Sequence, residues 1–298
     1  MDRKKASDFD QEVLDLFDQY VHGSLDRRGF LDRVGRFAIA GMTAGMILDA
    51  LSPRFAEAQK IAKDDKRVAA SYVEFESPKG NGKVRGYLAR PAGGKAKLPA
   101  VLVVHENRGL NPHIEDIARR VALEKFVAFA PDALTPLGGY PGDEDKAREL
   151  FGKLDETKTR EDFVAAVGFL KGHPGSTGMV GVVGFCFGGL VANILATRVP
   201  DLGGAVAFYG RQPSAEEAAR IVAPVLIHYA ENDERVNAGA AAYEAALKAN
   251  RVKHQVYKYP GTQHGFNNDT TPRYDKAAAD LAWKRTIDFF KKNLRRPA

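Results

Sequence analysis

The feature that most constrains the fold is a glycine-rich turn between an apolar run and a helix-compatible run. Residues 179–183 are apolar or glycine, residues 184–189 read GFCFGG, and residues 190–196 suit a helix. A strand that turns this sharply into a helix presents the residue at the turn, here Cys186, at the helix N-terminus. That position favours an anion such as a thiolate. Cys186 is the only cysteine in the chain, so the sequence predicts a strand–turn–helix unit that presents a reactive thiol.

An acid and a histidine follow this turn, each after a further strand-like run. Asp233 lies in a loop after the run at 223–227, and His264 follows the run at 255–259. An imidazole can take the thiol proton and later return a proton to a leaving group. A carboxylate fixes the tautomer of that imidazole and stabilises its charged form. Nucleophile, acid and histidine stand in the chain order of α/β-hydrolases, which predicts a catalytic triad.

Strand-like and helix-like runs alternate along the rest of the chain. The run at 100–104 is apolar throughout, as expected for a central parallel strand. The runs at 71–76 and 84–89 flank an Asn-Gly pair and predict an edge hairpin. Alternation of this kind predicts the α/β class, with a mostly parallel central sheet and helices on both faces. Residues 59–298 are expected to form this single α/β-hydrolase domain.

Together these motifs resemble the dienelactone hydrolase family of α/β-hydrolases. The turn around Cys186, Asp233 in ENDERV, His264 in QHGF and the segment HENRGL at 105–110 carry the resemblance, which runs from about residue 68 to residue 294. It implies a hydrolase of carboxylic esters or enol lactones that works through a thioester acyl-enzyme. Neither a metal nor an organic cofactor is implied.

The resemblance also assigns roles around the triad. In that family a glutamate contacts the nucleophilic cysteine and helps to control its ionisation, and the matching residue here is Glu106. The backbone N–H of the next residue and that of the residue after the cysteine form the oxyanion hole. These positions are Asn107 and Phe187.

The founding enzymes of the family hold a substrate carboxylate with two arginines, one of them four residues after the catalytic histidine. Asn268 stands at that position here. Arg273 and Arg148 are the candidates to replace the two arginines, and ordinary solvated charges are the alternative interpretation of both. Tyr140 is a candidate pocket residue because the Gly/Pro-rich loop at 131–142 leaves the carboxyl end of a strand.

The charge composition limits the kinds of molecule that the protein is expected to bind. The net charge is +6, but Lys and Arg are scattered rather than clustered with aromatic residues, which argues against nucleic acid. The expected partner is a small-molecule ester or lactone, and a monomer and a homodimer are both open. A broad carboxylesterase or thioesterase would share the triad, and a non-catalytic binding protein is a further alternative. The remaining histidines are interpreted as structural or surface residues: His22, His113, His173, His228 and His254.

The segment 1–58 resembles a twin-arginine export signal. An arginine pair at 27–28 precedes an apolar stretch at 37–48 and an Ala-x-Ala-like cleavage site at 56–58. The stretch is too short to anchor the chain in a membrane, which needs about 20 apolar residues. We therefore expect export to the periplasm by the twin-arginine machinery. The alternative is a cytoplasmic protein with a retained helical arm, in which an amphipathic helix at 10–22 docks on the domain or pairs two subunits.

Overall fold

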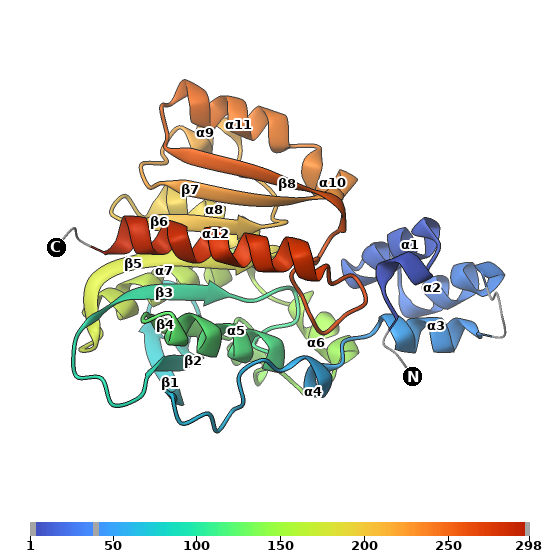
Figure 1. Ribbon diagram of the computed structural model, residues 1–298, viewed down its shortest axis with the longest axis horizontal. Helices are drawn as coiled ribbons and strands as arrows, with labels where there is room; N and C mark the ends of the chain where they lie inside the picture. Colours follow the sequence, from blue (N-terminus) through green and yellow to red (C-terminus); the bar gives the residue numbers. More distant parts are fainter. Residues whose placement is uncertain (1–3, 38–41, 296–298) are drawn as a thin grey trace.

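The computed structural model describes residues 4–37 and 42–295, which form one eight-stranded sheet, helices on both of its faces and a helical arm at one end (Figure 1). The sheet order is β1-β2-β4-β3-β5-β6-β7-β8. The strands are β1 (Val68–Ser77), β2 (Gly82–Pro91), β3 (Leu98–Val104), β4 (Val127–Pro131), β5 (Ser176–Phe185), β6 (Gly204–Phe208), β7 (Val225–Asn232) and β8 (His254–Gln263). Strands β3 to β8 run parallel, and β1 and β2 form an antiparallel edge hairpin. The predicted α/β-hydrolase fold is confirmed.

Two layers of helices bury the two faces of the sheet. The helices are α5 (Pro112–Leu123) and α12 (Lys276–Leu294) on one face, and α7 (Glu156–Gly172), α8 (Phe187–Arg198) and α11 (Ala240–Ala249) on the other. Alternate residues of β3 show why both faces need cover. Val101 and Val103 belong to the core under α5 and α12, whereas Leu102 and Val104 belong to the core under α7 and α8. A strand buried on both faces must be apolar throughout, as β3 is.

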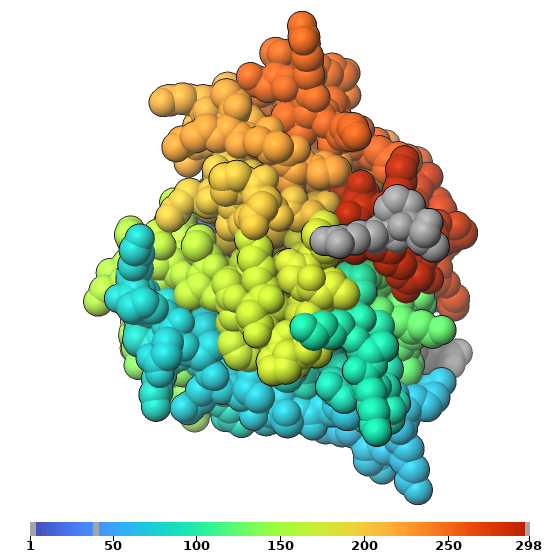
Figure 2. Space-filling view, turned by 90° about the vertical axis from the view of Figure 1, so that its left-hand side faces the viewer, coloured from blue at the N-terminus to red at the C-terminus, as the bar shows by residue number. Residues whose placement is uncertain are grey.

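Four short helices lie in the connections: η3 (Thr135–Leu137), α6 (Glu144–Phe151), α9 (Ala215–Ala218) and α10 (Glu234–Asn237). Figure 2 shows the end of the molecule from which the parallel strands start, where the outer hairpin, in cyan, and the chain around the start of β5, in yellow-green, form much of the surface. Among the helices formed by the described residues, none is both long enough and apolar enough to cross a membrane.

The arm precedes the sheet and consists of short helices with an apolar core of their own. Its elements are η1 (Ala6–Asp8), α1 (Gln11–Val21), α2 (Arg27–Val34), η2 (Gly35–Phe37), α3 (Ala44–Leu51) and α4 (Phe55–Ala58). The side chains of Asp10, Asp26 and Thr43 cap α1, α2 and α3 by accepting hydrogen bonds from backbone N–H groups. The core includes Phe17, Tyr20, Phe30, Val34 and Leu51.

The arm lies beyond the carboxyl ends of the parallel strands (Figure 1), the edge at which α/β sheets bind ligands. Helix α1 corresponds to the amphipathic helix expected at 10–22. Part of the apolar stretch predicted at 37–48, residues 38–41, lies outside the described residues. Export by the twin-arginine route stays a prediction.

Candidate active site

Cys186 lies at the turn between β5 and α8 in a conformation that residues other than glycine rarely adopt. Its φ is 55° and its ψ is −111°, a conformation that costs of order 1–3 kcal/mol and is typical of functional sites. The neighbouring glycines make this turn possible. A Cβ on Gly184 would meet the carbonyl oxygen of Gly188, and a Cβ on Gly188 would meet that of Val104 at the end of β3. The thiol therefore sits at the N-terminus of α8, against the segment that follows β3.

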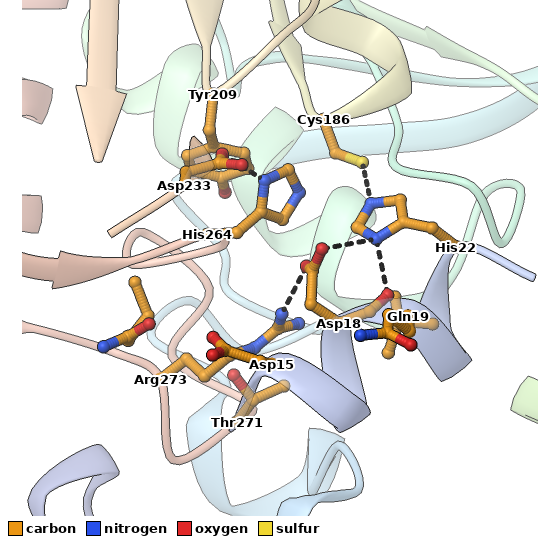
Figure 3. A network of polar contacts seen from close by, with 12 residues as sticks. Asp15, Asp18, Gln19, His22, Cys186, Tyr209, Asp233, His264, Thr271 and Arg273 are labelled. Carbon is orange, nitrogen blue, oxygen red and sulfur yellow. Dashed lines mark hydrogen bonds and ion pairs between the residues drawn. The ribbon is translucent and has the colours of Figure 1, made fainter. Parts of the chain in front are cut away.

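Asp233 and His264 lie beside the thiol, as the chain order predicted (Figure 3). Oδ2 of Asp233 lies 2.6 Å from Nδ1 of His264, while Oδ1 accepts a hydrogen bond from the backbone N–H of Val236 in α10. A ring nitrogen of His264 lies within 4.8 Å of the sulfur of Cys186. All three residues are buried, with 5% to 8% of each exposed. The structure thus brings together the three residues of the predicted triad.

A second histidine, His22 at the end of α1, contacts the same thiol. Its Nε2 lies 3.3 Å from the sulfur of Cys186, and its Nδ1 lies 3.2 Å from the carboxylate of Asp18. Figure 3 shows His22 and His264 on either side of this thiol. The interpretation of His22 as a structural or surface residue is therefore wrong. His22 is 164 residues from Cys186 in the chain, and the one signal for it was its place at the end of the predicted amphipathic helix.

These charges shift the pKa values of the site. Burial opposes ionisation of the Cys186 thiol, but the positive charges of His264 and His22 outweigh it and lower the thiol pKa to about 6. Burial also opposes protonation of His264, but the negative charges of Asp233 and Cys186 outweigh it and raise the pKa of His264 to about 10. The pKa of His22 is raised against its burial by Cys186 and Asp18. The site therefore favours a thiolate beside the imidazolium of His264 at neutral pH.

Glu106 lies next to this cluster, but other groups bind its carboxylate. The Tyr209 hydroxyl donates to Oε1 at 3.4 Å, and Nδ2 of Asn268 donates to Oε2 at 2.9 Å. The two carboxylate oxygens of Glu106 are bonded to Tyr209 and Asn268, so the hydrogen bond with the cysteine that the resemblance implies is not made in this arrangement. The ring of Tyr209 also lies 5.0 Å from that of His264.

The two positions assigned to the oxyanion hole lie on neighbouring segments. Phe187 is the first residue of α8, and Asn107 lies in the loop after β3. These segments touch because Gly188 packs against the backbone of Val104 and His105. The side chain of Asn107 donates a hydrogen bond of 2.9 Å to the carbonyl oxygen of Val21 in the arm.

The two candidate arginines contact the arm. Arg148 donates to the carbonyl oxygen of Tyr20 at 2.8 Å and covers the ring of that residue. Arg273 lies 3.4 Å from the carboxylate of Asp18. Their side chains are 17% and 8% exposed, which rules out ordinary solvated charges. Tyr140 donates a hydrogen bond of 2.9 Å from its hydroxyl to Glu144.

Helix α1 lies between two cavities. One cavity, of about 720 Å³, is lined by residues that include Asp18, His22, Asp233, Arg235 and His264. The other, of about 370 Å³, is lined by residues that include Tyr20, Glu106, Asn107, Tyr140, Asn268 and Arg273. Opposite sides of α1 line the two cavities, so the arm divides the space above the triad.

Three of the described residues have ligand atoms close enough together for a metal ion: His22, Cys186 and His264. A guanidinium nitrogen of Arg235, however, lies 2.9 Å from Nε2 of His22 and 3.5 Å from Nδ1 of His264. A positive charge at this place repels a second cation. We therefore assign no metal to the cluster.

Comparisons with known proteins identify the family of the chain. The model of the dienelactone hydrolase family matches residues 84–294, and a model described as YqhI-like matches residues 1–37. The "Putative hydrolase fragment YghX" of Escherichia coli K12 is 53% identical over 116 residues, which are 39% of this chain and 99% of the fragment. A "Putative carboxymethylenebutenolidase" of the same organism is 30% identical over 242 residues, covering 76% of this chain and 88% of the relative.

A solved structure also shows similarity to the dienelactone hydrolases. The crystal structure of a "Putative Dienelactone Hydrolase" from Klebsiella pneumoniae matches with a TM-score of 0.65 and 27% identity, covering 75% of this chain and 99% of that one. The family match includes the turn of Cys186, Asp233 and His264 and spans most of the chain. This protein therefore belongs to the dienelactone hydrolase family of α/β-hydrolases and is a carboxylic ester hydrolase.

Proposed function

We propose that the protein cleaves carboxylic esters or enol lactones by covalent catalysis at Cys186. The observation that carries this proposal is the buried chain of contacts from Asp233 through His264 to the thiol at the strained turn. The lowered pKa of Cys186 supports it, because a thiolate is the nucleophilic form. A thiolate suits substrates whose leaving groups need little protonation, such as enol lactones and activated esters.

The proposed reaction has two halves. The sulfur of Cys186 attacks the substrate carbonyl carbon, the carbon–oxygen bond to the leaving group breaks, and the proton on His264 passes to the departing oxygen. His264 then takes a proton from a water molecule, whose oxygen attacks the thioester and releases the acid and the thiolate. Asp233 stabilises the imidazolium of His264 in both halves of the reaction. The backbone N–H groups of Asn107 and Phe187 are proposed to hold the oxyanion.

The remaining predicted residues have proposed roles on the substrate side. Arg148, Arg273 and Tyr140 are proposed to bind the acyl portion of the substrate, including a carboxylate where one is present. A part for Glu106 in controlling the cysteine requires its carboxylate to turn from Asn268 toward the sulfur.

Acylation of the thiol tests the proposed function. Brief incubation of the full chain with p-nitrophenyl acetate should release nitrophenol and leave an acetyl group on Cys186, detected by mass spectrometry of the peptides. His264→Ala should abolish the adduct because the pair that holds the thiolate is lost. Unmodified protein and no nitrophenol would contradict the proposal and favour a binding protein on a hydrolase scaffold. Rapid turnover of many unrelated esters and thioesters would favour a broad carboxylesterase or thioesterase.

A further inference from the structure

The arm reaches the reacting atom of the proposed triad. Among the described residues, the sulfur of Cys186 makes a hydrogen bond of 3.3 Å with Nε2 of His22. Nε2 of His264, by contrast, is buried without a hydrogen-bond partner among these residues. A polar contact of the nucleophile therefore comes from the arm, outside residues 84–294 that match the hydrolase family.

His22 has the support that a working imidazole needs. The carboxylate of Asp18 and the carbonyl oxygen of the same residue lie 3.2 Å and 2.8 Å from Nδ1 of His22. Nε2 faces the sulfur and also lies 2.9 Å from a guanidinium nitrogen of Arg235. The carboxylate of Asp18 is itself 3.5 Å from Arg235 and 3.4 Å from Arg273. Asp18 and His22 thus repeat, on the other side of the thiol, the carboxylate–imidazole arrangement of Asp233 and His264.

The backbone before His22 is fixed at two consecutive residues. The carbonyl oxygen of Tyr20 accepts a hydrogen bond from Arg148, and that of Val21 accepts hydrogen bonds from Asn107 and Arg108 at 2.9 Å and 3.2 Å. Two segments of the hydrolase domain, the loop after β3 and helix α6, therefore hold the end of α1. The position of the imidazole beside the thiol is therefore fixed by the docking of the α1 backbone and not only by the rotamer of His22.

We propose that His22, held by Asp18, is a second imidazole partner of the Cys186 thiolate, so that the N-terminal arm completes the active site. The inference rests on the proposed function of Cys186 as the nucleophile. In the proposed resting state the imidazolium of His22 donates from Nε2 to the sulfur, which requires the guanidinium of Arg235 to turn away from that nitrogen, and His22 makes no covalent bond. When the sulfur becomes a neutral thioester, this partner charge is lost, and the proton of His22 is held less tightly.

Other charged groups also face this thiol and bear on its ionisation. The arm contributes Asp18 and His22, and the hydrolase domain contributes Glu106, Arg108, Tyr209 and His264, with Asp233, Arg235 and Arg273 behind them. Glu106 and a tyrosinate would oppose the thiolate, and the cations favour it. His22 is in hydrogen-bond contact with the sulfur, so its removal should have an effect that the loss of a more distant charge does not reproduce.

The test is the pH dependence of Cys186 alkylation in the full chain, with EDTA in every buffer. Wild-type protein should react with iodoacetamide in step with thiol ionisation, with a midpoint near the thiol pKa of about 6. His22→Gln keeps a hydrogen-bond donor but loses the charge, so the midpoint should rise by about one unit or more toward the ordinary value of about 8.5. Gln19→Ala, on the exposed side of α1, is the matched control and should leave it unchanged.

Each result decides the inference. If the arm only covers the site, His22→Gln changes the plateau rate of alkylation but not the midpoint, and the proposal is overturned. Asp18→Asn gives a second variant should His22→Gln fail to fold, and its midpoint should move in the same direction. Acylation by p-nitrophenyl acetate is measured on the same samples. A wild-type protein that is acylated but whose midpoint is insensitive to His22 refutes this inference alone, whereas no acylation refutes the proposed function.

Discussion

At the scale of single residues, the charges around His264 set the pH range in which the triad works. The thiolate of Cys186 forms as the pH rises through about 6, and the imidazolium of His264 is lost as the pH rises through about 10. Because the reactive pair needs both charges, kcat/KM should be bell-shaped, with the two limbs belonging to the coupled pair. In Asp233→Asn the neutral amide no longer stabilises the imidazolium. The upper limb should move to lower pH, and kcat/KM should fall by up to roughly 10⁴-fold.

The measurement is the rate of p-nitrophenyl acetate hydrolysis from about pH 5 to pH 11, with the spontaneous rate subtracted. Asp15→Asn is the matched control, because Asp15 lines the same cavity as His264 but its carboxylate accepts a hydrogen bond from Gln11 in the arm. That variant should keep both limbs. An upper limb that does not move in Asp233→Asn would contradict the assignment of Asp233 as the orienting acid.

At the scale of elements, the junction of β5 with α8 depends on the absence of a side chain. A Cβ on Gly188 would meet the carbonyl oxygens of Val104 and His105, and backbone atoms cannot turn aside as a side-chain end can. Gly188→Ala should therefore push α8 away from β3 and lower the free energy of unfolding by about 1–3 kcal/mol. Gly168→Ala, in α7 where nothing lies within 4 Å, should raise it by about 0.5–1 kcal/mol. Urea unfolding measures both, and equal effects would contradict this account.

The elements also show what one sequence can and cannot predict. The turn around Cys186 and the apolar strand β3 are encoded in consecutive residues, so pattern and turn chemistry identify them. Asp233 and His264 follow from the chain order of a known arrangement. The contact of His22 with the thiol depends instead on the docking of α1, which is set by hydrogen bonds to Asn107, Arg108 and Arg148. These partners are far from α1 in the chain, so the local pattern of apolar and polar residues cannot predict the contacts.

At the scale of the whole molecule, the fate of the arm and the chemistry of the site are linked. Cleavage after Ala58 would remove His22, and with it the contact to the thiol. If the arm completes the site, the protein isolated from its native source should keep the full mass of 32.5 kDa. Intact-mass spectrometry measures this in periplasmic and cytoplasmic fractions. A chain that begins at Gln59 and retains full activity would contradict a role for the arm and would support its function as an export signal.

The arm and the hydrolase domain also have separate apolar cores, which predicts that the arm can unfold alone. Phe30 is fully buried in the core of the arm against Phe17 and Tyr20. Phe30→Ala should lower the free energy of unfolding of the arm by about 3–5 kcal/mol. This is as much stability as an apolar core of this size contributes in total. Brief trypsin digestion should then remove the arm while the domain keeps its unfolding temperature. Met46→Ala, at an exposed position of α3, should resist digestion like the wild type. Loss of the whole fold in Phe30→Ala would show instead that the arm and the domain unfold as one unit. The contacts between α1 and the hydrolase domain would then couple the unfolding of the two cores.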